Sequence, residues 1–533
     1  MGIVSKVHPV RSHSNAAQGG INAALQPEDS WESHAYDTVK GSDYLGDQDA
    51  IEIMCREAPE EILHLEHLGV TFHRNEEGKL GTRAFGGASA ARTYYVADIT
   101  GQAILHVLYE QLMKHPEVER FEEWFTTAIV KDENGRIAGA VTRNMRDGSL
   151  ELFSSKAVIV ATGGNGQLFS PTTNALICTG DGIAMAYRAG APLMDMEMVQ
   201  YHPTTLAGLG LLITEGARGE GAHLLNAEGE RFMEKYAPNK MELASRDVVS
   251  RAEQTEIDEG RGFPDGTVAL DITVVPRKRI HEALREIVNV GRDFAGVDIT
   301  REPIHIKPGN HYVMGGVKTD VHGQTDVPGL YAAGECACIS VHGGNRLGAN
   351  SLLDTLIFGR RSGQHAAASG RGMGIPEPAE ADLARERKTI AAIVSRERTG
   401  RRVSELKAEM GAVMDKDCSV FRDEKRLKGA LEVIKRLQEE VGTVAVDDKG
   451  AVFNQDVLGV LELQFMLDNA ECTLVGAIER EESRGAQFRT DYPERDDEEW
   501  LKHIDLTENG RDVPEVSFSP VTMTQWEPEE RKY

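Results

Sequence analysis

The sequence predicts an α/β protein built around a Rossmann-like nucleotide-binding sheet. Two short apolar runs, residues 156–164 (KAVIVATGG) and 329–335 (GLYAAGE), end in glycine. A continuous apolar run is typical of a strand buried on both faces, and glycines at its carboxyl end let a ligand approach the backbone. Residues 277–292 and 425–441 repeat apolar side chains at helical spacing. Strands of this kind combined with amphipathic helices indicate the α/β class.

The chain is long enough for several hydrophobic cores, since it has 533 residues. We expect a discontinuous sheet domain over residues 1–203 and 309–370, with an α+β domain inserted over 204–308. A linker rich in glycine and proline, starting near residue 370, then leads into a helical domain over 371–470. Residues 471–533 return to polar and aromatic sequence and are expected to form a C-terminal α+β segment.

Charge and hydropathy restrict the possible partners. A net charge of -26 disfavours nucleic acid, because polyanions select basic surfaces. This charge also fits a high-salt host or a basic partner subunit. No window approaches the roughly 18 to 20 apolar residues of a membrane-spanning helix, and the N-terminus lacks a secretory h-region. We therefore expect a protein on the cytoplasmic side that reaches the membrane only through partner subunits.

The six cysteines are scattered along the chain. Their spacings do not match the short repeats that hold zinc or an iron–sulfur cluster, so no metal site is predicted. Free, mostly buried thiols in a reducing compartment are the expected state.

A histidine next to an arginine, in Arg11-Ser12-His13-Ser14, is followed by Gln18-Gly19-Gly20. Taken alone, such a histidine is usually a surface or core residue. The paired glycines require a backbone that takes positive φ or lies against a flat partner.

Polar residues of types that bind carboxylates recur on several separate segments of the chain, each flanked by glycine. Arginine offers a fork that matches a carboxylate, and histidine and threonine donate hydrogen bonds. A hydrophobic core without a binding site does not require such a set of polar residues. Its members are His202, Thr214, Arg246, His311 and Arg346.

Together these motifs resemble the flavoprotein subunits of succinate dehydrogenase and fumarate reductase. The resemblance extends over nearly the whole chain, from residues 36–55 (YDTVKGSDYLGDQDAIEIMC) to residues 482–500 (ESRGAQFRTDYPERDDEEW). It implies an FAD-binding domain interrupted by a mobile capping domain, followed by a helical domain and a C-terminal domain. It also implies FAD bonded covalently to His13 and hydride transfer between the flavin and succinate or fumarate.

The resemblance assigns the substrate contacts. Arg346 and His311 are expected to bind one carboxylate, and His202 with Thr214 the other. Phe85, which precedes paired glycines, matches a family phenylalanine beside the substrate.

The resemblance assigns proton transfer to Arg246, with Glu215 and Arg218 passing the proton onward. Arginine normally stays protonated in proteins. Ser245, however, is a candidate N-cap, which would place Arg246 in the first turn of a helix, where the helix dipole disfavours positive charge. The alternative is that Arg246 and Glu215 form only a buried ion pair.

Further residues match family contacts to FAD. Glu335 matches the acid that binds the ribityl chain, and Asp181 another cofactor contact. The remaining predicted contacts are Ser12, Ser14, Gln18, Gly19, Gly20, Gly163, Gly164, Ser351 and Leu352.

The resemblance also implies partners and exposes one departure. Electrons would leave through an iron–sulfur subunit, which connects to membrane anchor subunits. Family members carry a strand, a G-x-G-x-x-G turn and a helix ahead of the strand that reads Gly2-Ile3-Val4-Ser5-Lys6. We expect that this first strand and glycine loop are missing because the start site is misplaced, and that a chain without them holds FAD weakly.

Several functions remain open on the sequence alone. Succinate dehydrogenase and fumarate reductase run one reaction in opposite directions, and the sequence does not choose between them. L-aspartate oxidase shares the histidine and arginine elements but lacks the covalent histidine. A non-catalytic, truncated subunit is a further alternative.

Overall fold

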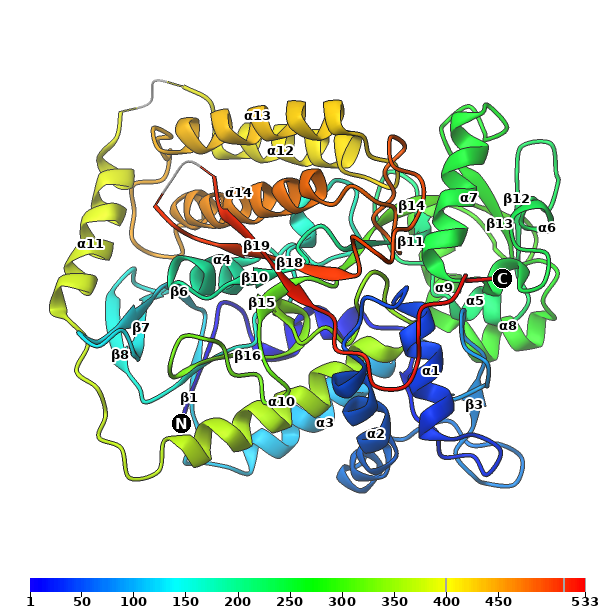
Figure 1. Cartoon of the computed structure of the whole chain (residues 1–533), viewed down its shortest axis with the longest axis horizontal. Helices are drawn as coiled ribbons and strands as arrows, with labels where there is room; N and C mark the ends of the chain where they lie inside the picture. Colours follow the sequence, from blue (N-terminus) through cyan, green and yellow to red (C-terminus); the bar gives the residue numbers. More distant parts are fainter. Residues whose placement is uncertain (398–399, 511–512, 533) are drawn as a thin grey trace.

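The computed structural model describes residues 1–397, 400–510 and 513–532 (Figure 1). The helices are α1 (Trp31–Gly41), α2 (Gln48–Leu68), α3 (Thr100–Met113), α4 (Asp181–Arg188), α5 (Gly216–Gly219), α6 (Met233–Tyr236), α7 (Arg246–Asp258), α8 (Arg277–Ala283), α9 (Arg285–Val290), α10 (Asn350–Ser369), α11 (Glu380–Ser395), α12 (Val403–Asp417), α13 (Glu424–Val441) and α14 (Gln455–Glu479). The strands are β1 (Gly2–Ser5), β2 (Ile21–Asn22), β3 (Thr82–Arg83), β4 (Thr93–Tyr94), β5 (Glu119–Glu122), β6 (Trp124–Lys131), β7 (Ile137–Asn144), β8 (Leu150–Ser154), β9 (Val158–Val160), β10 (Leu193–Met194), β11 (Val199–Leu206), β12 (His223–Leu225), β13 (Val268–Asp271), β14 (Ile304–Val313), β15 (Gly316–Lys318), β16 (Leu330–Ala332), β17 (Ala337–Cys338), β18 (Lys502–Thr507) and β19 (Glu515–Pro520).

The two glycine-ended runs form neighbouring parallel strands, which confirms the predicted α/β class. Strand β9 pairs with β16, with Ile159 opposite Tyr331. Strand β1 pairs in parallel with β5. Within the described ranges each of these parallel sheets has two strands. The prediction that the first run is buried on both faces is wrong for Ile159, which is 39% exposed.

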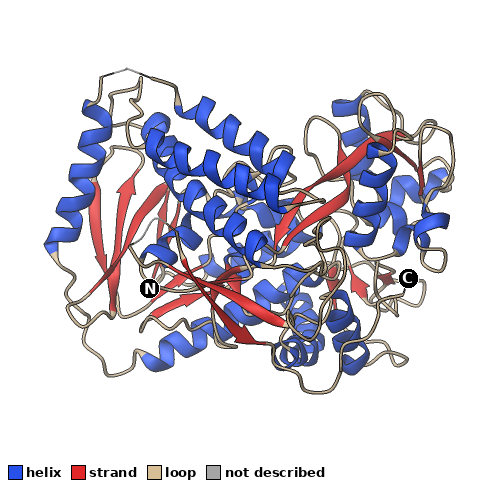
Figure 2. Cartoon of the chain, turned by 45° about the horizontal axis from the view of Figure 1, so that its top comes forward, coloured by secondary structure: helices blue, strands red, loops and turns tan. Residues whose placement is uncertain are grey.

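The segment between β11 and β14 forms a four-stranded antiparallel sheet in the order β11-β14-β13-β12, with α5 to α9 around it. Both cartoons show this segment gathered at one end of the molecule (Figures 1 and 2). The chain enters the segment along β11 and returns along β14, and these two strands pair with each other. The boundaries expected at residues 203 and 308 fall inside these two strands.

One helix predicted in this segment is interrupted. Residues 277–292 form α8 and α9, separated at the fully buried Leu284. The break follows from tertiary contacts, because the Asp98 carboxylate accepts a hydrogen bond from Glu286 N at 2.6 Å and so caps the start of α9.

Helices α11 to α14 follow the Gly- and Pro-containing linker. Helix α13 has the predicted periodicity, and its buried face packs with α12 onto α14 (Figure 1). The expected boundary at residue 470 lies inside α14. Among the described helices, none combines the length and apolar character that a membrane span requires.

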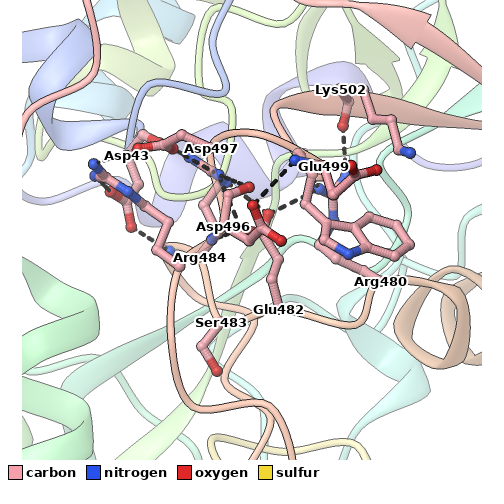
Figure 3. Close-up of polar contacts among 12 residues, drawn as sticks. Asp43, Arg480, Glu482, Ser483, Arg484, Asp496, Asp497, Glu499 and Lys502 are labelled. Carbon is pink, nitrogen blue, oxygen red and sulfur yellow. Dashed lines mark hydrogen bonds and ion pairs between the residues drawn. The ribbon is translucent and has the colours of Figure 1, made fainter.

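The C-terminal segment joins the core through buried charges. Strands β18 and β19 extend the sheet β17-β15-β10-β18-β19. Arg484 donates to both oxygens of Glu482, at 2.7 and 2.9 Å, and to the Asp43 carbonyl oxygen at 3.0 Å (Figure 3). Arg480 contacts Glu482 and also donates to Glu197 at 2.7 Å. This network connects the segment around residues 482–500 to the turn that follows α1 and to the residues just before β11.

Candidate active site

A cavity of about 330 Å³ lies where the sheet region meets the inserted segment. Its walls contain residues from chain segments more than 300 positions apart. The predicted residues that line it are Ser12, His13, Ser14, Gln18, Gly19, Gly20, Phe85, Gly163, His202, Thr214, Glu215, Arg246, His311, Glu335, Arg346, Ser351 and Leu352. Three predicted residues lie outside the lining: Gly164, Asp181 and Arg218.

His202 and His311 face each other from the paired strands β11 and β14. Their ring centroids are 4.8 Å apart. Burial and the neighbouring guanidinium groups lower the pKa of both imidazoles well below the usual value. His202 Nδ1 accepts a hydrogen bond from Thr204 N at 3.2 Å. The proton of neutral His202 therefore sits on Nε2, which can donate to a carboxylate.

Arg246 and Arg346 form the cationic part of the cavity. Arg246 Nη1 and Arg346 Nη2 both donate to Gln200 Oε1, each at 3.0 Å. The Arg346 guanidinium also lies over the Tyr312 ring, 4.5 Å from its centroid. Burial and the charge of Arg246 lower the pKa of Arg346 to about 9. Gln200 was not among the predicted site residues; its only sequence signal is its place two residues before His202.

Arg246 continues into a chain of buried charges. Its Nε donates to Glu215 Oε2 at 2.7 Å, and Arg218 Nη2 lies 3.7 Å from the same oxygen. Glu215 Oε1 accepts from Gly86 N at 2.6 Å. Burial opposes ionisation of Glu215, but the two guanidiniums lower its pKa, so it is a carboxylate. Arg246 and Glu215 form a buried ion pair, and both residues line the cavity.

Arg246 is the first residue of α7, as predicted, and Ser245 is the N-cap residue. The expected side-chain cap is absent from the described structure. Ser245 Oγ instead accepts a hydrogen bond from Asn345 Nδ2 at 2.9 Å. The backbone dipole at the start of α7 still acts at Arg246.

The other end of the cavity has the shape for a flat cofactor. Gly163 has φ +74°, and a Cβ at this position would point into open space. The Gln18 Oε1 atom is buried and has no hydrogen-bond partner among the described residues. Arg83, which sequence reasoning missed, donates to the carbonyl oxygens of Gln18 and Gly19 and so fixes this loop. Glycine-lined walls and an unused acceptor fit a planar ring with hydrogen-bonding edges.

His13 and Glu335 border this end of the cavity. His13 Nδ1 accepts a hydrogen bond from Ala175 N at 3.3 Å. Burial lowers the His13 pKa to about 4, so the ring is neutral. Its Nε2 atom is then the nitrogen that can react with a bound cofactor. Burial raises the pKa of Glu335 to about 7. Gly164 packs against this acid, because a Cβ there would meet Glu335 Oε1.

Asp181, a predicted cofactor contact, has polar partners within the chain. It pairs with Lys6 Nζ at 2.6 Å and accepts a hydrogen bond from Thr179 at 2.7 Å. Phe85, by contrast, lies on the cavity wall against Gly19, as expected for a residue beside a ligand. All six cysteines are unpaired and buried.

Comparisons with known proteins agree with this geometry. Residues 2–352 match the family model described as FAD binding domain, and residues 407–533 match that of the fumarate reductase flavoprotein C-terminus. The chain is 46% identical to the succinate dehydrogenase flavoprotein subunit of Rickettsia conorii, over 98% of the chain and 91% of that protein. It is 43% identical to the fumarate reductase flavoprotein subunit of Mycobacterium tuberculosis, over 100% and 94%. The E. coli quinol fumarate reductase FrdA superposes with a TM-score of 0.96 at 37% identity, covering 99% of the chain and 93% of FrdA.

Proposed function

Because the chain belongs to the family of succinate dehydrogenase and fumarate reductase flavoprotein subunits, we propose that it oxidises succinate to fumarate as a succinate dehydrogenase. The reverse reduction of fumarate is the second candidate, since relatives of both kinds match at similar identity. A non-catalytic role is less favoured, because the predicted substrate residues lie together on one cavity. L-aspartate oxidation is less favoured, because L-aspartate oxidase lacks the covalent histidine that His13 matches.

The observation that carries the proposal is the charge of the cavity. Two buried guanidiniums, of Arg246 and Arg346, line the cavity together with the Glu215 carboxylate and with Glu335, whose pKa burial raises to about 7. A third buried guanidinium, of Arg218, lies behind Glu215, so positive charge prevails around the cavity. A dicarboxylate carries two negative charges and therefore neutralises this cluster. Buried charges are stable only when paired, so the cavity selects a doubly charged anion over a monoacid.

Each of these residues has a role in the reaction that follows from its position in the site. Arg346 and His311 bind one carboxylate of the substrate, and His202 with Thr214 binds the other, beside Phe85. Arg246 holds the proton that leaves or joins the substrate carbon, and Glu215 and Arg218 carry it away from the cavity. Bound FAD supplies the hydride acceptor. Polarisation of the substrate carboxylate by Arg346 stabilises the charge that develops on the neighbouring carbon.

The cofactor would lie in the glycine-lined end of the cavity. His13 would be covalently bonded to FAD through Nε2, since its Nδ1 already accepts from Ala175 N. Glu335, Gln18, Gly163, Ser351 and Leu352 would contact the cofactor, together with Ser12, Ser14, Gly19 and Gly20. Asp181, which pairs with Lys6, stays a predicted contact of the cofactor.

We further propose that electrons pass to a separate iron–sulfur subunit and through it to membrane anchor subunits and quinone. Two observations support this proposal: the relatives are named as subunits, and the related E. coli protein is a quinol fumarate reductase. The protein would then lie peripherally at the cytoplasmic face of the plasma membrane.

The test is an assay of the purified chain with FAD supplied. Succinate should reduce an artificial dye acceptor, and fumarate should oxidise a reduced viologen. The faster direction identifies the enzyme, and L-aspartate serves as the control substrate. Activity with L-aspartate alone, or with none of the three, would overturn the proposal.

A further inference from the structure

The last residues of the chain connect two parts of the molecule. Residues 522–532, which we call the C-terminal strap, follow β19 and run beside α1 and α2 to the inserted segment. Figure 1 shows the C-terminus next to that segment. The proposed function assigns no role to the strap. Its contacts, however, reach the helix that begins with Arg246.

One buried side chain of α2 fixes the path of the strap. Gln48 is 0% exposed, and its Oε1 atom accepts from the backbone N–H groups of residues 524–526, at 3.0, 2.9 and 3.0 Å. Its Nε2 atom donates to the Trp526 carbonyl oxygen at 2.7 Å. The Trp526 ring also lies against Tyr36 of α1, with 6.2 Å between the ring centroids. Both polar atoms of the Gln48 side chain therefore bind the strap and anchor it to the sheet region.

The Arg531 guanidinium lies between two buried carboxylates that come from different parts of the chain. Its Nη2 atom is 2.9 Å from Asp43 Oδ2 and donates to Asp247 Oδ2 at 2.7 Å. Asp43 follows α1 in the sheet region, whereas Asp247 is the second residue of α7 in the inserted segment. The Arg531 side chain is only 9% exposed. Its guanidinium thus bridges the sheet region and the inserted segment.

Without this bridge the two carboxylates would repel each other. Burial opposes ionisation of Asp43 and Asp247, but Arg531 lowers the pKa of both, so both are charged. The charge of Asp247 partly counters this lowering at Asp43, because the two anions act on each other. Solvent and salt screen such buried charges little. Arg531 therefore replaces a repulsion between the two parts by an attraction.

A second arginine makes a parallel contact from α7 to the core. Arg251 donates to Asp247 Oδ2 at 3.0 Å and to the Gly485 carbonyl oxygen at 2.8 Å. Gly485 N donates in turn to Asp43 Oδ2 at 2.7 Å. These contacts close a ring that consists of Asp43, Arg531, Asp247, Arg251 and Gly485. Because Arg251 remains in place, loss of Arg531 should weaken the attachment of α7 and not abolish it.

The ring holds the end of α7 that carries Arg246. Asp247 directly follows Arg246, which is the first residue of this helix. Arg246 is also the cavity end of the proposed proton relay, which continues through Glu215 and Arg218. Adjacent residues in a helix move together. The attachment at Asp247 therefore determines whether Arg246 stays at the cavity.

We propose that the C-terminal strap is a latch, in which Arg531 holds the inserted segment against the sheet region and so keeps Arg246 at the cavity. Arg531 is a positioning residue in this proposal, because it acts through Asp247. The inference rests on the proposed function, since Arg246 has its role only if a dicarboxylate binds there. With the latch, the site is complete before the substrate arrives. Without it, part of the binding free energy of the dicarboxylate must bring the segment back into place.

Steady-state kinetics of the FAD-loaded protein test this role. Arg531→Gln should raise the KM for succinate about 10-fold, because only a fraction of the molecules then has the complete site. The kcat should stay within about 2-fold of wild type, since saturating succinate restores that site. Lys532→Gln is the matched control, because it removes the same charge from an exposed neighbour that pairs with Glu530. This control should behave as wild type.

A second substitution tests the electrostatic part of the proposal. Asp247→Asn removes one of the two like charges and keeps the shape of the side chain. The double variant Arg531→Gln/Asp247→Asn should therefore have a lower KM than Arg531→Gln alone. Two independent effects would instead raise KM further, and this result would overturn the latch. Arg531→Lys keeps a positive charge between the carboxylates and should lie close to wild type.

Hydrogen exchange measures the attachment of α7 without turnover. In Arg531→Gln the backbone amides of α7 should exchange about 10-fold faster than in wild type or Lys532→Gln. Malonate is a dicarboxylate that cannot be dehydrogenated, because it lacks two adjacent CH2 carbons, and it should restore the slow exchange.

Three results would contradict the latch. Exchange in Arg531→Gln that matches wild type is the first, and a loss of kcat at unchanged KM is the second. The third is a lower thermal unfolding midpoint without any change in KM, which is the result expected for a purely structural Arg531. A wild-type chain that turns over no dicarboxylate would instead contradict the proposed function, and the exchange rates without malonate would still decide the latch.

Discussion

Arg246 and Arg346 donate to one acceptor, Gln200 Oε1, at the same distance of 3.0 Å. Arg246 begins α7 in the inserted segment, whereas Arg346 lies just before α10. Two like charges brought together in a buried site repel each other, and the shared amide oxygen offsets part of this cost. Gln200 therefore holds both guanidiniums side by side in the cavity wall.

Replacement of Gln200 by methionine should weaken this arrangement. Methionine has similar volume but cannot accept two hydrogen bonds from charged donors. The KM for succinate should rise about 10-fold to 100-fold, and the free energy of unfolding should fall by about 1–3 kcal/mol. Dye-reduction kinetics and thermal unfolding measure the two effects. If KM and stability both match wild type, the amide does not position the arginines.

Glu215→Gln should remove the carboxylate that we propose receives a proton from Arg246. Glutamine keeps the acceptor for Gly86 N, so the local fold should survive. We expect kcat to fall about 100-fold or more, with dicarboxylate affinity retained, as measured by turnover and by ligand-induced quenching of flavin fluorescence. Glu220→Gln is the matched control, because Glu220 pairs with Arg279 outside the relay. Equal losses in both variants would argue against a proton role.

His13→Ser should separate covalent from non-covalent FAD. Wild-type protein precipitated in acid should keep yellow flavin fluorescence in the pellet, whereas the variant should release all of it into the supernatant. His8→Ser is the control, since His8 contacts Tyr109 and does not line the cavity. Free flavin released from the wild type would refute the covalent assignment.

The stability of the C-terminal segment should depend on pH through His503. Burial opposes protonation, but Asp195 and Asp47 raise the pKa of this imidazole to about 10. A raised pKa means that the folded state binds the proton more tightly than the unfolded chain. The stabilisation is therefore complete below about pH 6.5, the unfolded pKa, and is lost as pH rises toward 10.

His503→Gln should lower the free energy of unfolding at pH 6 by on the order of 3 kcal/mol. It should also remove the decline in stability between about pH 6.5 and 10, measured by chemical unfolding across that interval. His115→Gln is the control, because His115 is 61% exposed. A wild-type decline that persists unchanged in His503→Gln would assign it to other groups.

Sequence reasoning predicted the features that depend on residue type and local spacing. The strands at β9 and β16, the periodicity of α13 and the start of α7 at Arg246 follow from short-range patterns. Convergence of His202, Arg246, His311 and Arg346 on one cavity followed from the chemistry that these residue types share.

The features that were missed depend on distant partners. The break at Leu284 requires the cap that Asp98 provides to Glu286 N, and these two residues are 188 positions apart in the chain. Asp181 is engaged by Lys6, and the amide of Gln200 bridges two arginines. No local pattern distinguishes any of these contacts.

Strands β11 and β14 are the two chain crossings into the inserted segment, and they also carry His202 and His311. A rotation of that segment would therefore bend this ribbon, close to the histidine pair. Points near a pivot move little, whereas the far strand β12 and the helices beyond it move through a wide arc. Opening of the site by such a rotation would therefore leave His202 and His311, two of the proposed substrate ligands, nearly in place.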